Sequence, residues 1–545
     1  MMVCEYIADF LKSKGVQDIF MLTGYGAMYM NDALAKSGMK YYATRNEATA
    51  PMMAEAYARI KQSIGVVCVT AGPGATNAIP GLAEAWVDSA PVIILSGQVD
   101  RNQHRFPSRS FGIAGVDIIP TVQHMTKFSS VVSDPNMIRY LLEKAFYLAT
   151  SGRPGPVWLD IPLDVQQLRV AEENMDGFSP PCTKEINISS EVFGLIYNAK
   201  ELLVVCGQGV RQSGAITEVK ALINMLGAPV IFSRLGQDLY PHSDRLIYGH
   251  GGVKGLPYSK KIMGNADVVL VLGSRLATQF VGAGESIFKS AKLIVIDTDE
   301  DELKNKNIYC PIHGDVKDFV VNLMHEIDVS KIPSFNQWLE WCSHIKNRYN
   351  ISLDQRKKNP IDLYYFMSRV NDLSGSRNVF ITDAGSNYYV GGQMLTFEKG
   401  QREVTSGAFA AMGTGIPLAI GASIADPSSQ ILAFTGDGSL ELNIQELKTI
   451  SHYDLNIKLF VINNGGYISM AKWQDPYFEG RRIDGIKSTG CGSLNLKKIA
   501  DAFDIRYSLI SDYKEIDSSV KNLLKEDGPM FVEVICDDKQ DIISW

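Results

Sequence analysis

The sequence has no long hydrophobic run, no CxxC pair of cysteines and no excess of basic charge. No apolar stretch approaches the roughly 18–20 residues that a membrane-spanning helix needs. The amino terminus mixes acids into its apolar pattern and has no signal-peptide profile. The formal net charge of −7 provides no basic footprint for nucleic acid. These absences predict a cytoplasmic protein with neither membrane nor nucleic-acid partners.

The eight cysteines are scattered along the chain, and Cys68 and Cys206 lie inside apolar, strand-like runs. Disulfides and metal sites would call for closer or paired spacing in an oxidising compartment. We therefore interpret the cysteines as reduced core residues, with disulfides or metal ligands as the disfavoured alternative.

Short β-branched apolar runs alternate with helical patterns along all 545 residues, which predicts parallel sheets covered by helices. Val3, Ile7, Phe10 and Leu11 recur at helical spacing before Gly15, which predicts an opening helix with a glycine stop. The expected strands are Asp18–Leu22, Val66–Thr70, Val92–Ser96, Val157–Ile161, Leu202–Cys206, Val230–Phe232, Val268–Leu272, Leu293–Ile296, Val379–Thr382, Ile431–Phe434, Leu459–Ile462 and Phe531–Ile535.

These runs fall into three blocks, and the length also exceeds what one hydrophobic core supports. A polar stretch near 170–190 that contains Pro180 and Pro181 has the composition of a linker. The fold class predicted is α/β, with three doubly wound parallel-sheet domains at 1–170, 188–330 and 355–545.

The third block contains the most informative residues. A buried-type strand runs into Gly436-Asp437-Gly438-Ser439 and then into an apolar-periodic segment, LNIQELKTI, which is expected to be a helix. Glycines let backbone N–H groups approach an anion, and a helix N-terminus adds a favourable dipole. An aspartate in such a turn is understandable if a hard cation lies between its carboxylate and phosphate oxygens.

The next strand ends in Asn463-Asn464-Gly465-Gly466. Since one helix returns the chain to the same edge of a parallel sheet, both polar clusters should meet where ligands of α/β sheets bind. Asp437, the Asn464 amide oxygen and the Gly466 carbonyl would then offer three positions to Mg²⁺.

The Gly-Asp-Gly and Asn-Asn motifs at this interval resemble the signature of the thiamine diphosphate-binding fold. The resemblance implies a Mg²⁺ held by Asp437, Asn464 and Gly466. It also implies that the diphosphate is held by Gly436, Gly438, Ser439 and the loop that contains Asp383, Gly385, Ser386 and Asn387.

Such cofactors need a carboxylate at the aminopyrimidine N1′, where it promotes removal of the C2 proton. Glu47 lies where a strand-like Tyr41-Tyr42 segment meets an apolar helix, and it resembles the activating glutamate of the family. A glutamate that only stabilises a helix start is the alternative. To share a proton with N1′, Glu47 is expected to lie in a dry pocket that raises its pKa.

Three strings place the resemblance on the acetolactate synthase branch: Thr70–Asn77, Asp88–Gln98 and Ser151–Pro162. The branch implies a pyrimidine-binding first domain, a central domain and a diphosphate- and Mg²⁺-binding third domain. It further implies cofactor contacts at Pro73, Asn77, Ala411, Met412, Tyr467 and Ile468, with Glu47 as the catalytic residue.

Met412, in Gly407–Gly413, is similar to the bulky residue that props the cofactor into its bent shape; the alternative is a gap-filling core methionine. Many relatives have histidine before the glutamate, and this chain has Asn46, so a histidine acid/base is absent there.

The middle block resembles the domain in which acetolactate synthases hold FAD. Gly207-Gln208-Gly209 alone is too short for a dinucleotide fingerprint. Gly249–Gly255, Ser274-Arg275 and Asp297–Asp299 fall where flavin contacts would lie. Both alternatives stay open: a bound FAD, or a domain that has lost its ligand.

The chain departs from the synthases at the acceptor site. Aligning on Gly273–Leu276 places Thr278 and Gln279 where they have an Asp-Arg pair, whose arginine holds a 2-keto acid carboxylate. Trp473 matches their specificity tryptophan. Thr23–Met28 and Phe478–Arg482 resemble a subgroup from surface-polysaccharide and deoxysugar pathways, some of which are thought to use keto-sugar acceptors.

The sequence thus predicts a carboligase that takes an acyl unit from a decarboxylated 2-keto acid, by preference pyruvate, to a second carbonyl. Acetolactate synthesis proper and simple decarboxylation are the rival enzyme activities; a non-catalytic cofactor-binding paralogue and a nicotinamide oxidoreductase are disfavoured. The resemblance implies a homodimer or homotetramer, because the glutamate and the diphosphate anchor of one site come from different chains.

Overall fold

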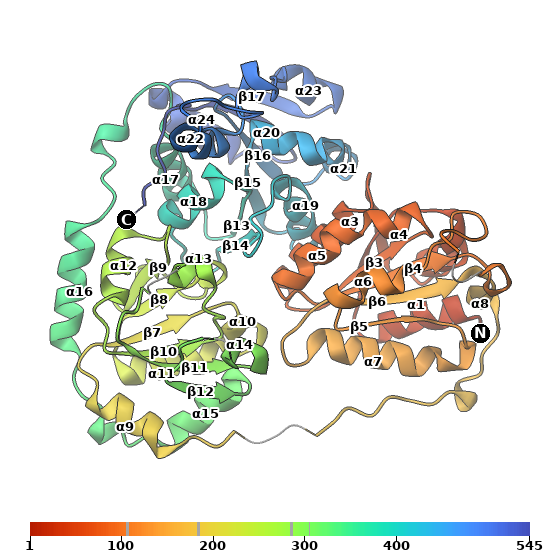
Figure 1. Cartoon of the computed structure of the whole chain (residues 1–545). Coiled ribbons are helices and arrows are strands. Elements are labelled where there is room, and N and C mark those ends of the chain that lie inside the picture. The colour runs from red at the N-terminus through yellow and green to blue at the C-terminus, as the bar shows by residue number, and fades with distance from the viewer. Residues whose placement is uncertain (105–107, 183–185, 284–286, 305, 545) are drawn as a thin grey trace.

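A computed structural model describes residues 1–104, 108–182, 186–283, 287–304 and 306–544 of the chain (Figure 1). It contains three parallel sheets of six strands each, with helices packed against their faces. The predicted α/β fold of three doubly wound sheets is confirmed.

The first sheet has the strand order β2-β1-β3-β4-β6-β5. Its strands are β1 (Asp18–Met21), β2 (Lys40–Ala43), β3 (Gly65–Val69), β4 (Val92–Gln98), β5 (Phe128–Val131) and β6 (Val157–Pro162). Its helices are α1 (Val3–Ser13), α2 (Met28–Lys36), α3 (Thr49–Lys61), α4 (Pro73–Asn77), α5 (Ile79–Val87), α6 (Ile119–Val122), α7 (Ile138–Thr150) and α8 (Leu163–Gln167). The predicted opening helix is α1, and Gly15 follows it at φ +81°.

The second sheet has the order β12-β11-β10-β7-β8-β9, so that β7 and β10 flank the point where the strand order reverses. Its strands are β7 (Leu202–Cys206), β8 (Val230–Phe232), β9 (Ile247–His250), β10 (Val268–Leu272), β11 (Lys292–Asp297) and β12 (Cys310–His313). Its helices are α9 (Ser190–Asn198), α10 (Gly209–Gln212), α11 (Ile216–Leu226), α12 (Pro257–Met263), α13 (Thr278–Val281), α14 (Glu300–Lys304), α15 (Val316–Glu326) and α16 (Asn336–Arg348).

The third sheet, β14-β13-β15-β16-β18-β17, repeats the order of the first. Its strands are β13 (Asn378–Thr382), β14 (Arg402–Thr405), β15 (Gln430–Gly436), β16 (Ile457–Asn463), β17 (Arg506–Ile510) and β18 (Met530–Ile535). Its helices are α17 (Leu363–Leu373), α18 (Ser386–Met394), α19 (Gly415–Ala425), α20 (Asp437–Leu440), α21 (Leu447–His452), α22 (Ile468–Tyr477), α23 (Leu496–Ala502) and α24 (Ile516–Leu523).

Every strand lies inside one of the three predicted domain ranges, whose exact boundaries stay a prediction. Part of the predicted linker, 183–185, lies outside the described residues. None of the helices in the described ranges has the length and hydrophobicity that a membrane span requires. Cys68 and Cys206 are buried within β3 and β7 and form no disulfide, as expected.

One prediction about the third domain needs correction. The segment LNIQELKTI is not one continuous helix, because a 3-10 turn at Glu441–Glu446 separates the short α20 from α21. Asn443 has non-helical backbone angles (φ −137°), and its side-chain amide donates to the Gly413 carbonyl at 2.8 Å. That contact ties the segment to the neighbouring loop instead of continuing the helix.

The first and third domains share one hydrophobic core. Helices α3 and α19 pack directly against each other and bury nearly all of their side chains. Gly421 permits this approach, since a Cβ there would lie 2.1 Å from the Met53 carbonyl oxygen. The two domains are therefore held together by tight helix packing within one chain.

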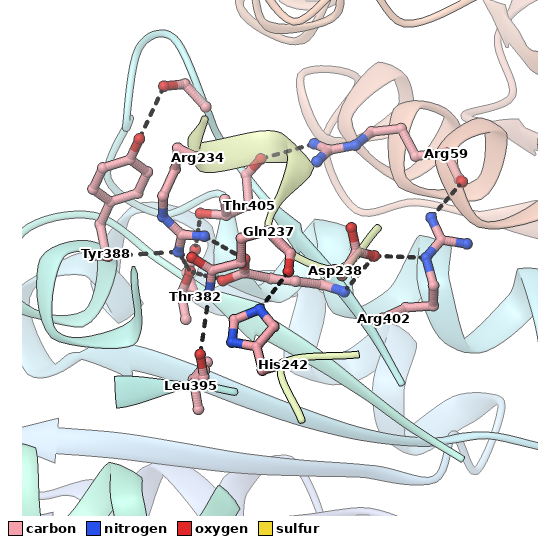
Figure 2. A network of polar contacts seen from close by, with 12 residues as sticks. Arg59, Arg234, Gln237, Asp238, His242, Thr382, Tyr388, Leu395, Arg402 and Thr405 are labelled. Atoms are coloured by element: carbon pink, nitrogen blue, oxygen red, sulfur yellow. Dashed lines mark hydrogen bonds and ion pairs between the residues drawn. The ribbon is translucent and has the colours of Figure 1, made fainter. Parts of the chain in front are cut away.

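A buried polar network joins all three domains (Figure 2). Arg234 of the middle domain forms a two-pronged ion pair with Glu403 and also donates to the Thr382 hydroxyl at 3.0 Å. Arg59 of the first domain donates to the Thr405 carbonyl at 2.7 Å. Asp238 accepts from Arg402 at 2.7 Å. Strand β14, which carries Arg402 to Thr405, is thus held by the two other domains as well as by its own sheet.

Candidate active site

The carboxyl ends of three neighbouring strands bring the predicted anchor residues together. Strands β13, β15 and β16 are adjacent, with Thr382 paired to Phe434 and Gly436 paired to Ile462. Asp383, Asp437 and Asn464 therefore follow their strands at the same edge of the sheet. Strands β13 and β15 also flank the reversal of strand order, where open α/β sheets bind ligands.

The Asp437 carboxylate bridges the two turns. Its Oδ1 accepts the Gly438 N–H at 3.0 Å, and its Oδ2 accepts the Gly465 N–H at 3.1 Å. Burial raises the pKa of Asp437 to about 6, although these backbone N–H groups oppose the shift. A carboxylate in this situation has lone pairs left for a cation, whose charge would favour the ionised form.

The surrounding residues fit a bound diphosphate and metal ion. Asn387 is buried, and its Oδ1 has no hydrogen-bond partner, which is unusual for a buried amide. Its Nδ2 lies 3.7 Å from where a Cβ on Gly436 would stand. Gly385 and Gly466 have φ values of +64° and +123°, which turn the backbone in ways that other residues disfavour. This edge thus combines an unsatisfied buried amide oxygen with several glycines.

The remaining anchor residues line the same edge. Gly438 and Tyr467 are in close contact, since a Cβ on Gly438 would lie 2.3 Å from the Tyr467 ring. Ser439 and Ile468 are buried at the starts of α20 and α22, and Ser386 begins α18. The chain thus brings together Gly436, Asp437, Gly438, Ser439, Asn464, Gly466, Tyr467 and Ile468 with Gly385, Ser386 and Asn387.

The side chain of Asp383 is engaged within the chain, and its expected contact with the diphosphate stays a prediction. Its Oδ1 accepts the N–H groups of Ala384 and Gly413, at 2.7 and 3.1 Å, and its Oδ2 accepts the Thr435 hydroxyl at 2.7 Å. A buried carboxylate so engaged ties two loops together; burial raises the pKa of Asp383, although these hydrogen bonds oppose the shift.

Met412 lies on the loop from Ser406 to Gly413, which approaches the anchor. The loop is closed by the Ser406 hydroxyl, which accepts the Ala411 N–H at 3.1 Å. Met412 is 44% exposed and Phe409 is 53% exposed. In this single chain Met412 is not a buried gap-filling residue, which removes that alternative.

Glu47 lies in the first domain, at the turn between β2 and α3. Its Oε2 accepts the Asn77 side-chain N–H at 3.0 Å, and Oε1 lies 3.5 Å from the place of a Cβ on Gly74. Glu47 and Asn77 are therefore in contact, and Pro73 begins α4, the short helix that ends at Asn77. The expected dry pocket is not present within the chain, because Glu47 is half-buried and Asn77 is exposed.

The two halves of the predicted site remain apart in one chain. No hydrogen bond or ion pair within the described ranges joins Glu47 to the Asp437 edge. In Figure 1, α4 lies in the right-hand domain, whereas α22 lies at the far side of the third domain.

The middle domain contributes a cavity of about 640 Å³ at its own point of strand reversal. Gln208 and Gly209 follow β7, and Ser274 and Arg275 follow β10. Gln279 and Trp473 line the same cavity, so the two predicted specificity residues are brought together. The Gln279 side-chain N–H points to the Ala408 carbonyl at 3.4 Å.

Sequence reasoning missed side chains that act across domains. Glu446, fully buried after α20, accepts the N–H groups of Arg45 and Asn46 at 2.8 and 3.2 Å and the Thr49 hydroxyl at 2.8 Å. It thereby holds the turn that carries Glu47. The only feature of the sequence that could have indicated this role is that Glu446 is an acid within the apolar-periodic segment LNIQELKTI.

Comparison with known proteins gives the same division into three parts. Residues 1–126 match the model "Thiamine pyrophosphate enzyme, N-terminal TPP binding domain", residues 189–323 the central domain and residues 383–534 the C-terminal TPP binding domain. Together these models cover most of the chain, in the order expected.

Similar curated proteins include acetolactate synthases and acetolactate synthase large subunits. The chain is 28% identical to the large subunit of Lactococcus lactis subsp. lactis (strain IL1403), over 99% of this chain and 93% of that protein. It is 29% identical to that of Cyanidium caldarium, over 97% and 92%, and 28% identical to the chloroplastic acetolactate synthase of Arabidopsis thaliana, over 99% and 82%. With the three domain matches in order, these similarities confirm the predicted resemblance: the chain belongs to the thiamine diphosphate-dependent enzymes, in the acetolactate synthase-like family.

Proposed function

We propose that this thiamine diphosphate-dependent carboligase transfers an acyl unit from pyruvate to a neutral carbonyl, such as a keto-sugar, in preference to a second 2-keto acid. The observation that carries the proposal is the uncharged pair Thr278–Gln279 beside Trp473 at the cavity. A carboxylate entering a partly dry site needs a paired cation, whereas an amide serves a ketone or hydroxyl oxygen.

Two arginines of the same cavity are already engaged by acids. Arg153 is paired with Asp299 at 2.9 Å, and Arg234 is paired with Glu403. A third arginine, Arg275, interacts electrostatically with Asp88. Burial raises the pKa of Asp88, and the positive charges of Arg59 and Arg275 oppose this shift. Because these three arginines already interact with acids of the protein, they support an acceptor substrate that carries no negative charge near Gln279.

The cofactor site is assigned as follows. We propose that Asp437, the Asn464 amide oxygen and the Gly466 carbonyl hold Mg²⁺, and that the N–H groups of Gly436–Ser439 and the Asn387 side chain hold the diphosphate. When bound, thiamine diphosphate would supply the nucleophilic carbon and the electron sink that decarboxylation and acyl transfer require. Glu47 would hold and return the proton at N1′, and Met412 would support the bent cofactor.

Acceptor choice is tested by the Gln279→Arg substitution. The added guanidinium should raise kcat/KM for acetolactate formation by at least about tenfold, because a charge-assisted bond to a carboxylate contributes roughly 1.5–3 kcal/mol. Product analysis by mass spectrometry with pyruvate alone, and with pyruvate plus neutral ketones, measures this. Gln279→Met is the matched uncharged control and should give no such gain.

The unmodified enzyme decides the matter. Its kcat/KM for neutral ketones should exceed its kcat/KM for pyruvate as acceptor. Efficient acetolactate formation by the wild type would return this protein to the ordinary synthases.

We propose FAD as the occupant of the part of the cavity that is lined by Gly209, Asp297 and Thr298, whereas Gln279 and Trp473 serve the acceptor. The position of this part at the strand reversal supports a dinucleotide, and Asp297 and Thr298 at the end of β11 line it together with Gly209 after β7. A visible flavin spectrum in the purified protein tests this; a colourless protein that takes up no added FAD would leave the domain purely structural.

We further propose a homodimer, or a tetramer of such dimers, in which Glu47 of one chain meets Asp437 of its partner. Exposed apolar side chains at both half-sites support this assembly: Tyr25 and Ile113 in the first domain are 64% and 77% exposed, and Trp473 in the third is 63% exposed. Such patches mark surfaces that another molecule covers.

Mixing two inactive variants tests the assembly. Co-expression of Glu47→Gln and Asp437→Ala chains should restore about one quarter of wild-type activity, because about half of the dimers are mixed and each then contains one intact site. Each variant expressed alone is the control. No restoration in dimers that are shown to be mixed would place both residues of a site on the same chain.

The predicted cytoplasmic location also stays a proposal. Six buried cysteines that form no disulfide support a reducing compartment, and cell fractionation would test the location.

A further inference from the structure

The backbone of Gly407 and Ala408, just before Met412, is held by side chains from elsewhere in the molecule. The Gly407 N–H donates to Asp88 Oδ2 at 2.6 Å, and the Ala408 N–H donates to Asp88 Oδ1 at 2.8 Å. Asp88 belongs to the first domain, where it caps the end of α5 and is 4% exposed. One buried carboxylate thus receives two successive N–H groups of another domain.

The two carbonyls of the same dipeptide are also engaged. The Tyr388 hydroxyl donates to the Gly407 carbonyl at 3.1 Å, as the left of Figure 2 shows, and the Gln279 amide lies 3.4 Å from the Ala408 carbonyl. A Cβ on Gly407 would lie 2.5 Å from the Leu235 side chain. All three domains therefore meet at these two residues, and the Asp88 bonds are the shortest of the set.

Burial raises the pKa of Asp88, whereas Arg59, Arg275 and the two loop N–H groups oppose this shift. Arg59 lies 3.8 Å from Asp88 Oδ2 and itself donates to the Thr405 carbonyl, two residues before Gly407. Two further buried acids, Glu55 and Glu84, are close by, and burial raises the pKa of Glu84 to about 7. The cluster thus combines three buried acids with Arg59, and of these acids Asp88 alone receives two backbone N–H groups from the loop.

We propose that Asp88 is a positioning residue for the reaction: it fixes the loop from Ser406 to Gly413, and so the place of Met412, before any cofactor binds. The inference rests on the proposed role of Met412 as the cofactor's support. Only an acceptor-only group suits two parallel N–H donors, since an amide would direct its own N–H₂ at one of them.

The Asp88→Asn variant tests the proposal. Its kcat should fall by about tenfold to a hundredfold, as expected for lost bonds to a charged acceptor, while KM for pyruvate stays within about twofold. In the cofactor-free variant, backbone amide exchange in the peptide that contains Gly407 and Ala408 should be at least about tenfold faster than in the wild type. Asp88→Glu retains an acceptor-only group and should recover part of both losses.

Asp160→Asn is the matched control. Asp160 is also a buried acid of the first domain, but its partners are the side chains of Ser96 and Gln98, which can reorient. This variant should keep kcat within about twofold of the wild type and leave the Gly407–Ala408 peptide protected. Equal effects of the two substitutions on kcat and on exchange would show that Asp88 is merely structural, and would overturn the proposal.

Amide exchange in the wild-type protein tests the proposal without depending on whether a variant folds. If the Asp88 bonds position the loop, the Gly407 and Ala408 amides are protected from exchange in the cofactor-free protein; rapid exchange there overturns the proposal. Calorimetry with thiamine diphosphate and Mg²⁺ is the separate check on the proposed function, because absent binding would refute that function without altering the exchange result.

Discussion

Replacing Glu47 with glutamine is expected to lower kcat by about 10²–10⁴-fold, the range typical of a general acid or base, while thiamine diphosphate still binds. The amide keeps the size of the side chain and its contact with Asn77 but cannot hold the proton at N1′. The rate of hydrogen–deuterium exchange at the cofactor C2 reports this step directly and should fall with kcat.

Two comparisons make the Glu47 result specific. Glu143→Gln removes the same charge from α7, where Glu143 pairs with Arg139 at 3.0 Å, and should leave C2 exchange unchanged. If C2 exchange in the Glu47 variant stays as fast as in the wild type, another group activates the cofactor.

Replacing Asp437 with alanine is expected to weaken thiamine diphosphate binding by at least about 100-fold, because loss of groups that only support metal ligands already costs 10–100-fold. The carboxylate joins the Gly438 and Gly465 turns and is the one formal charge among the proposed metal ligands. Calorimetric titration of the cofactor with Mg²⁺, and again with EDTA, measures the loss.

The same site predicts a pH dependence with a definite sign. Because burial raises the pKa of the metal-free Asp437 to about 6, a proton competes with Mg²⁺ below that value. Affinity for the Mg²⁺ cofactor should fall as the pH drops below about 6 and level off above it. Asp501→Ala, which removes an exposed partner of Lys497, should affect neither measurement; unchanged affinity in Asp437→Ala would refute the anchor assignment.

Inner and outer strands show how far sequence reasoning reaches. Leu202–Cys206, Val230–Phe232 and Val268–Leu272 match their predicted bounds. The other predicted strands differ only at their ends, because strands buried on both faces are continuous apolar runs. The edge strands were missed, apart from the strand-like Tyr41-Tyr42 of β2. In β17, for example, Arg506 and Leu509 are exposed, so its pattern is weak. An edge strand pairs with a neighbouring strand on one side only, so its residues need not form the continuous apolar run of an inner strand.

The anchor could be predicted for a related reason. Gly436 to Ser439 and Asn463 to Gly466 are contiguous, and cradling a diphosphate with a metal ion requires those residue types at the ends of adjacent strands. Asp383 shows the limit of this reasoning. It lies at the site, but its carboxylate accepts hydrogen bonds from Ala384, Gly413 and Thr435.

By itself, the sequence determined the fold class, the family and the residues that would meet the cofactor, since each depends on local composition or on short motifs. Only the tertiary structure decided which side chains hold those residues in place. Asp88 reaches Gly407, and Glu446 reaches Arg45, across hundreds of residues of chain. Such contacts exist because α3 packs on α19 and brings two domains together, and no local pattern encodes the distance between them.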